Sequence, residues 1–305
     1  MTLAAVFPPM ATPFDGGEVD TTAIARNVRE WVRAGVGGIV ALGSNGEAPF
    51  LDETESDRVV AAVRDALPRS RLLIAGSGRE STRAAIAAST RAASLGADAV
   101  LVRTPSYYKG RMTRDAFLRH YSAVADASPV PVLLYNYPAV TGVNLTPDTV
   151  GRLSEHPNIV GIKETGSDGA QFAAYVDAVS RSFAVIAGSA PTFYSSLCLG
   201  ATGGILAVAC VVPELCVSLL DDFLAGRHRE ARELQRQLTP LARLVTTEFG
   251  VPGLKAAMQL AGYSAGDPRA PLAPASADAI QQIRAELEKL QAGNRQPGTG
   301  NVVVL

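Results

Sequence analysis

The sequence of 305 residues has little charge and very little lysine. Charged residues make up 19% of the chain, the formal net charge is −1, and lysine occurs only four times, at Lys109, Lys163, Lys255 and Lys289. This balance provides no basic surface for nucleic acid and no cluster of cations for a membrane surface. Glycine, proline or charge interrupts every apolar run before ~20 residues, so the sequence predicts no membrane span. We therefore expect neither nucleic acid nor a membrane as a partner.

Cysteine is also scarce, with Cys198, Cys210 and Cys216 each in an apolar context. Three thiols in such surroundings do not make a disulfide framework, and we expect all three in the core. No secretory leader is evident, because a strand-like segment begins by Val6 and two prolines follow it closely. The expected location is the cytoplasm.

The chain is rich in hydrophobic residues, 47% of the total. They recur in two kinds of segment, short apolar runs typical of strands and longer amphipathic stretches typical of helices. Stretches such as TTAIARNVREWVRAG and DETESDRVVAAVRDAL have apolar residues at helical spacing. Strands that are apolar on both faces need helices to cover them, so eight strand–helix units predict a parallel (β/α)8 TIM barrel. A doubly wound open sheet is the alternative. The eight expected strands are AAVFPPMATP, GGIVALG, RLLIAGSG, DAVLVRTP, VPVLLYNYP, IVGIKETG, FAVIAGSA and GGILAVAC.

Local signals mark the ends of helices and the limits of the barrel. Asp52 with Glu55 three residues later predicts a capping box, and Gly96 after AASL predicts a helix stop. After about residue 225 the alternation ends and only helical patterns follow. We expect a catalytic barrel over residues 1–225, a helical extension over 226–292 and a tail over 293–305.

A lysine stands where an apolar strand should continue, in the segment PNIVGIKETGSD. Burying the ammonium of Lys163 costs free energy unless the group is paired, neutral or used as an amine nucleophile. Desolvation lowers the pKa of such a lysine toward neutrality, and the free amine can attack a ketone. The simpler interpretation is a lysine that reaches from a strand end to a structural carboxylate.

In a parallel barrel, the chemistry lies at the carboxyl ends of the strands. An amine beside phenols and a glycine-rich hydroxyl and amide loop favours Schiff-base chemistry. A protonated imine withdraws electrons, so the C3–C4 bond of a 2-oxo acid can break by retro-aldol cleavage. The residues expected at this end are Thr12, the segment from Gly43 to Glu47, Tyr107, Tyr108, Tyr135, Asn136, Lys163, Thr165, Gly188 and Ser189.

Several segments in this order resemble the dihydrodipicolinate synthase / N-acetylneuraminate lyase family of class I pyruvate aldolases. The resemblance covers roughly residues 5 to 270 and is closest in look to the 4-hydroxy-2-oxoglutarate aldolases of that family. It implies reversible cleavage of 4-hydroxy-2-oxoglutarate to pyruvate and glyoxylate. The segments that carry it are ATPF, GSNGEAPFL, TPSYYKGRM, LLYNYPAVTG, NIVGIKETGSD, GATGGI and FGVPGLK.

The resemblance assigns roles to individual residues. It makes Lys163 the Schiff-base lysine and Tyr135 the proton shuttle, while Ser44 and Asn45 bind the pyruvoyl carboxylate. Tyr107 is implied to enter a neighbouring subunit's site, although the extra residue in TPSYY leaves Tyr108 as the alternative. Such sharing implies at least a dimer, and we expect a homotetramer built as a dimer of dimers.

Two departures from the synthase pattern narrow the expected substrate. The synthases have an arginine for the aldehyde's carboxylate where this chain has Val140, which cannot make that ion pair. They also tend to have alanine two residues after the lysine, whereas Thr165 offers a hydroxyl to the C4 oxygen. We expect Gly188, Ser189 and Tyr108 to complete the binding of a hydroxylated 2-oxo acid.

Other functions remain open at this point. Within the family they are a 2-keto-3-deoxy-sugar-acid aldolase or dehydratase and a divergent dihydrodipicolinate synthase. Outside enzymes, the same pocket would suit a pyruvate-binding metabolite sensor. We expect no metal and no cofactor, because the three histidines do not fall at strand ends and no G-x-G-x-x-G follows the first strand. The histidines are His120, His156 and His228.

Overall fold

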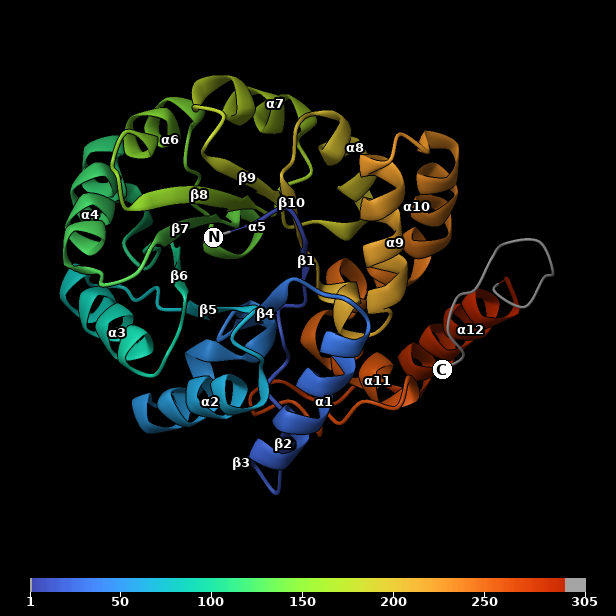
Figure 1. Cartoon of the computed structure of the whole chain (residues 1–305). Coiled ribbons are helices and arrows are strands. Elements are labelled where there is room, and N and C mark those ends of the chain that lie inside the picture. Colours follow the sequence, from blue (N-terminus) through green and yellow to red (C-terminus); the bar gives the residue numbers. More distant parts are fainter. Residues whose placement is uncertain (1, 294–305) are drawn as a thin grey trace.

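The computed structural model describes residues 2–293 of the chain, and the expected tail falls outside this range except for its first residue. Eight parallel strands form one sheet, in the order β1-β10-β9-β8-β7-β6-β5-β4. Figure 1 looks into this sheet, with the helices arranged around it. The strands are β1 (Val6–Phe7), β4 (Gly38–Ala41), β5 (Leu72–Gly76), β6 (Ala99–Arg103), β7 (Val132–Asn136), β8 (Ile159–Glu164), β9 (Ala184–Ala187) and β10 (Gly203–Ile205).

The first and last strands of that order meet, which closes the sheet into a barrel. A parallel bridge joins Pro9 to Val40, and backbone hydrogen bonds run from Met10 N to Val40 O at 2.9 Å and from Val40 N to Pro8 O at 3.0 Å. Closure removes both exposed sheet edges. The predicted (β/α)8 barrel is confirmed, and the open-sheet alternative is wrong.

Alternation along each strand divides the buried side chains into an inner and an outer core. On β7, Leu133 and Tyr135 belong to the cluster inside the barrel, whereas Val132 and Leu134 pack under the helices. On β8, Ile162 packs in the outer core, so its neighbour Lys163 points inward. The strands are apolar on both faces for this reason, and a polar residue on the inner face is exceptional.

The helices follow the strands in the expected alternation. The helix after β4 begins with the predicted capping box between Asp52 and Glu55, and Gly96, with φ of +91°, lies just past the end of the helix after β5. A small antiparallel hairpin, β2 (Phe14–Asp15) with β3 (Glu18–Val19), precedes the first helix. The surrounding helices are α1 (Thr21–Arg33), α2 (Glu53–Ala66), α3 (Thr82–Ser94), α4 (Arg114–Ala127), α6 (Pro147–Ser154), α7 (Gly169–Ala178), α8 (Phe193–Cys198) and α9 (Pro213–Leu224), with the short α5 (Pro138–Thr141) after β7.

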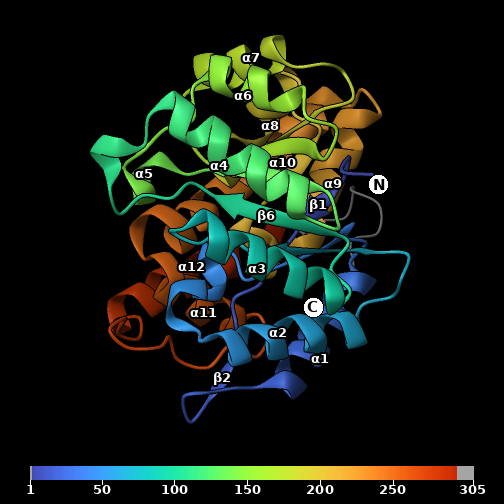
Figure 2. The same ribbon diagram turned by 90° about the vertical axis from the view of Figure 1, so that its left-hand side faces the viewer.

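Further helices follow the eight units: α10 (His228–Arg243), α11 (Gly250–Leu260) and α12 (Ala277–Gly293), with a π-turn at Leu244–Glu248 between the first two. α10 packs on α9, and α11 lies against the loop after β4. In Figure 2, α5 and α11 lie toward the left and the N-terminus lies on the right. The appended helices therefore reach the end of the barrel where the loops after the strands gather.

The burial of the cysteines agrees only in part with the expectation from the sequence. Cys210 and Cys216 are buried as expected, but the expectation for Cys198 is wrong, because it lies at the end of α8 and is exposed. Within residues 2–293, no helix is both long and apolar enough to span a bilayer.

Candidate active site

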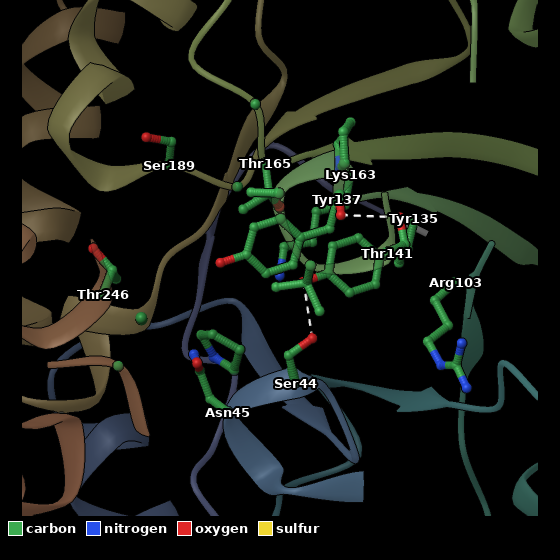
Figure 3. Close-up of a pocket in the computed structure, with 18 of the residues that line it drawn as sticks. Ser44, Asn45, Arg103, Tyr135, Tyr137, Thr141, Lys163, Thr165, Ser189 and Thr246 are labelled. Atoms are coloured by element: carbon green, nitrogen blue, oxygen red, sulfur yellow. Dashed lines mark hydrogen bonds between the residues drawn. The ribbon is translucent and has the colours of Figure 1, made fainter. Parts of the chain in front are cut away.

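A cavity of about 1030 Å³ opens at the carboxyl ends of the strands. Figure 3 shows Lys163 and Tyr135 pointing into it, with Ser44 and Asn45 on the opposite wall, Ser189 and Thr246 on one side and Arg103 on the other. Segments far apart in sequence thus meet around one space. The predicted residues that line it are Ser44, Asn45, Glu47, Tyr135, Lys163, Thr165, Gly188 and Ser189.

Lys163 is held near the end of β8 with only 4% of its surface exposed. Its register partners are Tyr135 on β7 and Ile186 on β9, so the strands on both sides fix the lysine backbone. Burial lowers the pKa of Lys163 to about 7, because the charged ammonium loses its hydration there. A large share of this lysine is therefore a free amine near neutral pH.

The ring of Tyr135 lies beside that amine. The Nζ atom of Lys163 lies 4.3 Å from the centre of the Tyr135 ring, and the Tyr135 hydroxyl lies 3.3 Å from Ser44 Oγ. Burial raises the pKa of Tyr135, while the hydroxyls of Ser44 and Thr165 act in the opposite direction. The phenol thus keeps its proton at neutral pH and lies where it can donate or relay one.

The Ser44–Gly46 segment is a single 3-10 turn that directly follows β4. Thr12 Oγ1 donates to the carbonyl oxygen of Gly46 at 2.7 Å, so the end of the first strand segment holds this turn. Leu42, two residues before the turn, and Glu47, directly after it, both have positive φ, at 56° and 55°. Left-handed backbone is unfavourable for residues other than glycine, so the surrounding contacts must hold this loop.

The wall beside Lys163 is built by the ends of β8 and β9. A Cβ atom on Gly188 would lie 2.2 Å from Thr165 Oγ1 and 3.0 Å from Lys163 Cε, so only glycine fits there. Thr165 Oγ1 is buried, and within residues 2–293 no well-formed hydrogen bond satisfies it. A buried hydroxyl without a partner costs free energy unless a ligand supplies one.

A polar network lies behind these strands, on their outer face. The expectation that Asn136 faces the cavity is wrong, because strand alternation turns its side chain away from the interior and into this network. Asn136 Nδ2 donates to Glu164 Oε2 at 2.8 Å, to the Asn144 side chain at 2.7 Å and to the Tyr175 hydroxyl at 3.1 Å. Its Oδ1 accepts from Leu145 N at 3.0 Å. Strand alternation was the available signal, since Asn136 and Glu164 directly follow two inward-facing residues. The network fixes the loop after β7, which carries Val140.

A second set of cavity residues was also missed by sequence reasoning. Arg103, at the end of β6, lies 2.7 Å from Glu80, and both line the cavity. Burial alone would raise the pKa of Glu80, but hydrogen bonds from the backbone of Tyr107 and Ser106 and from Arg103 lower it below its usual value. Other polar groups of the rim come from Thr141, Asn144, Gln171, Thr246 and Thr247.

Of the residues given a catalytic or substrate-binding role from the sequence, Tyr107 and Tyr108 do not line the cavity of this chain. Their exposed fractions are 78% and 70%, and their rings pack edge to face at 5.0 Å. Glu80 Oε2 accepts from Tyr107 N and Ser106 N, each at 2.9 Å, which holds the segment in place. Neither side chain lines the pocket formed by its own chain.

The next features of the site are its capacity to bind a metal ion and the cationic side chains that line the cavity. Within residues 2–293 no group of three or more His, Cys, Asp or Glu side chains is arranged to hold a metal ion. Lys163 and Arg103 are the cationic side chains among the described residues that line the cavity, and Val140 is 64% exposed at its rim. The arrangement offers a neutral amine, a protonated phenol and a wall of hydroxyls.

Comparison with known proteins relates this site to a family. The sequence profile of the dihydrodipicolinate synthetase family matches residues 2–290. A 4-hydroxy-tetrahydrodipicolinate synthase of Methanothrix thermoacetophila is 38% identical over 287 residues, covering 93% of this chain and 96% of that protein. A synthase of the same name from Exiguobacterium sp. is 34% identical over 281 residues, covering 92% and 95%.

Solved structures agree in fold along nearly the whole chain. A dihydrodipicolinate synthase of Bacillus anthracis has a TM-score of 0.90 and 28% identity, covering 94% of this chain and 99% of that one. A prophage protein of E. coli K12 from the dihydrodipicolinic acid synthase family, solved with pyruvate, has a TM-score of 0.90 and 29% identity, covering 95% and 99%. The family resemblance is confirmed. The narrower likeness to 4-hydroxy-2-oxoglutarate aldolases is not supported by these relatives, since the curated ones are named synthases.

Proposed function

The chain belongs to the dihydrodipicolinate synthetase family of class I, pyruvate-using enzymes, and on that basis we propose that it is an aldolase acting on 4-hydroxy-2-oxo acids. The proposed reaction reversibly cleaves the substrate to pyruvate and an aldehyde through an imine on Lys163. One observation carries the proposal: a buried lysine with its pKa lowered to about 7 lies beside the Tyr135 ring in the cavity of a parallel barrel.

The first step is attack of the free amine of Lys163 on the C2 ketone of the substrate. The carbinolamine loses water, and the C2 oxygen leaves with protons supplied by the amine and by Tyr135. The hydroxyl of Tyr135 is suited to this relay because it keeps its proton at neutral pH and lies 3.3 Å from Ser44 Oγ. Ser44 and Asn45, on the turn after β4, would hold the substrate's carboxylate through hydroxyl and backbone N–H groups.

The second step breaks the C3–C4 bond. The C4 hydroxyl loses its proton to Tyr135, with Thr165 as hydrogen-bond partner of the C4 oxygen, and the bonding electrons move into the imine to give an enamine. The aldehyde then departs. Protonation of the enamine at C3 and hydrolysis of the imine release pyruvate and restore the amine. The buried hydroxyl of Thr165, which makes no well-formed hydrogen bond within residues 2–293, supports its place in this step.

The side chains at the rim of the cavity indicate which aldehyde the reaction would release. Val140 offers no cation there, and Arg103 is held by Glu80 at 2.7 Å. We favour 4-hydroxy-2-oxoglutarate, which yields glyoxylate, and 2-keto-3-deoxy sugar acids are the alternative of the same class, by aldol cleavage or dehydration. Glyoxylate is small, so its carboxylate would lie close to Thr165 and Ser189 and would not reach Val140.

A second candidate is the reaction in the names of the relatives. A 4-hydroxy-tetrahydrodipicolinate synthase would form the same enamine from pyruvate and join it to an anionic amino aldehyde. Identity of 38% over 287 residues to a protein of that name favours this candidate. A sensor that binds pyruvate without turnover is the non-enzymatic possibility, and the lowered pKa of Lys163 speaks against it.

A substrate panel separates these functions. A lactate dehydrogenase couple would follow the release of pyruvate from each compound. The panel contains 4-hydroxy-2-oxoglutarate, two 2-keto-3-deoxy sugar acids and the 4-deoxy control of each. The proposal expects kcat/KM for cleavage of a 4-hydroxy-2-oxo acid to be at least ~10²-fold higher than kcat/KM for forming 4-hydroxy-tetrahydrodipicolinate. Synthase activity with no cleavage of any panel member would replace the proposal with the second candidate.

A further inference from the structure

A buried ion pair joins the appended helices to the loop after β4. The Nζ atom of Lys255, on α11, lies 2.7 Å from Glu47 Oε1, and both side chains are only 1% exposed. The catalytic steps above make no use of either group. Two opposite charges removed from water carry a large desolvation cost, so such a pair needs further contacts to hold it.

The C-terminal segment supplies those contacts. Lys255 Nζ also donates to the carbonyl oxygen of Asp267 at 3.0 Å and lies 4.2 Å from the centre of the Phe14 ring. The other carboxylate oxygen of Glu47, Oε2, accepts from Arg269 N at 2.7 Å. α11 and the chain that follows it therefore hold Glu47 through both of its oxygens.

The backbone of Glu47 joins two consecutive 3-10 turns in the loop after β4. It ends the 3-10 turn Ser44–Gly46 and begins the next turn, Ala48–Phe50, with φ of +55°. A residue with a side chain is unfavourable in that conformation, and the local contacts are the two turn hydrogen bonds, Glu47 N to Ser44 O at 3.2 Å and Phe50 N to Glu47 O at 2.8 Å. The dihedral angles of Glu47 therefore contribute to the direction in which the turn presents Ser44 and Asn45.

We infer that the Lys255–Glu47 pair positions the Ser44–Asn45 turn, so that Lys255 supports the pyruvate site although its side chain does not line the cavity. Lys255 is thus a positioning residue, and the helical extension has a direct role in substrate binding. The inference rests on the proposed function, in which the turn holds the carboxylate of pyruvate. Thr12 holds the same turn from inside the barrel, through its bond to Gly46, and Lys255 holds it from outside.

A purely structural role makes a different prediction for the variants. If the pair only neutralises buried charge, then Lys255→Met is harmful because it leaves the Glu47 carboxylate buried alone, and Glu47→Gln in the same chain repairs the defect fully. If the pair positions the turn, the double variant Glu47→Gln/Lys255→Met regains stability but does not regain pyruvate binding. Stability and binding thus separate the two roles.

The experiment follows labelling of Lys163 by borohydride as a function of pyruvate concentration, by intact-protein mass spectrometry. The variants are Lys255→Met, Glu47→Gln and the double variant. The matched control is Glu286→Gln/Lys289→Met, the same exchanges in a pair on α12 with a 2.6 Å contact and a lysine side chain that is 70% exposed. Hydrogen exchange of the peptide covering residues 42–51, without pyruvate, gives a second readout.

We expect the double variant and Glu47→Gln to fold, and the half-saturating pyruvate concentration of the double variant to rise at least ~tenfold, a loss of ~1.4 kcal/mol of binding. The labelling rate at saturating pyruvate should stay within ~threefold of wild type, and peptide 42–51 should exchange at least ~tenfold faster while peptides of β7 are unchanged. The control pair should change neither readout.

Wild-type half-saturation and exchange in the double variant, or in Glu47→Gln if the other variants do not fold, would overturn the inference. If wild-type protein is not labelled by pyruvate at all, the proposed function fails instead. The exchange measurement still decides whether Lys255 holds the turn, because it needs no ligand.

Discussion

Lys163 and Tyr135 are direct partners on adjacent parallel strands, with the lysine nitrogen 4.3 Å from the centre of the tyrosine ring. Because both face the interior of the barrel, the strand register alone brings an amine and a phenol together. The next residue on each strand, Asn136 and Glu164, makes the corresponding pair on the outer face, at 2.8 Å. One register therefore builds both the reactive pair and the network that supports it.

Tyr135→Phe should lower kcat by ~10²-fold or more and change KM much less, because it removes a proton-transfer group and keeps the ring. Steady-state kinetics with the best substrate of the panel checks this. Tyr121→Phe is the control, since that phenol is also buried but donates to Val102 O at 3.3 Å outside the cavity. A change confined to KM would make Tyr135 a binding residue.

The labelling rate of Lys163 at low pyruvate concentration should rise with pH through about 7 and then level off. Burial lowers the pKa of Lys163 to about 7, so the reactive free amine is the minor form below that pH. At pH 6 the rate should be about one-tenth of the plateau. Burial raises the pKa of Tyr135 and raises that of Cys210 to about 12, so neither neighbour titrates in this range. A flat profile between pH 5.5 and 8.5 would contradict the lowered pKa.

The lowered pKa of Lys163 should also make the free energy of unfolding depend on pH. The folded chain binds fewer protons at Lys163 than the unfolded chain between about pH 7 and the ordinary value of 10.5, so the free energy of unfolding should rise with pH in that window. Lys163→Met should be more stable than wild type at pH 7 and should lose this part of the slope. Urea unfolding at pH 7, 8.5 and 10 measures it, and equal slopes for the two proteins would count against a desolvated lysine.

Val140→Arg should shift preference by ~tenfold or more toward an anionic aldehyde that is longer than glyoxylate and reaches the rim, because the change adds a cation there. Val140 is 64% exposed, so the change leaves the core intact. Leu224→Arg, at a residue of α9 that is 62% exposed and lies away from the cavity, is the control for added charge. If kcat/KM ratios between neutral and anionic aldehydes are unchanged in the condensation direction, Val140 does not face the aldehyde half.

Sequence patterns predicted the barrel because each strand is apolar on both faces and each helix has one apolar side. They also predicted the part of the cavity wall around Lys163 and Tyr135, since residues at the ends of parallel strands must meet. The contact between Glu47 and Lys255 could not be predicted this way, because it joins a loop to an appended helix and depends on three-dimensional packing. Cys198 was misplaced because its neighbours are apolar, but α8 ends there and exposes it.

Mixed assemblies test the predicted sharing of sites between subunits. Tyr107 is 78% exposed in the single chain and does not line its own cavity, which supports a place in a neighbouring subunit. Lys163→Ala and Tyr107→Phe are each expected to be inactive alone. Co-refolded, they should regain up to about a quarter of wild-type activity, since some sites then hold both native residues. Activity that never exceeds the sum of the parents at any ratio would exclude the sharing.

The central claim is that Lys163 forms an imine with pyruvate, and borohydride reduction tests it most directly. Wild-type protein incubated with pyruvate and borohydride should gain one reduced pyruvoyl group, located on the peptide that contains Lys163 by mass spectrometry. Lys163→Ala and Lys163→Arg should gain none, because alanine has no amine and guanidinium stays protonated. A wild-type protein that stays unmodified at saturating pyruvate, or one modified at another lysine, would contradict the account.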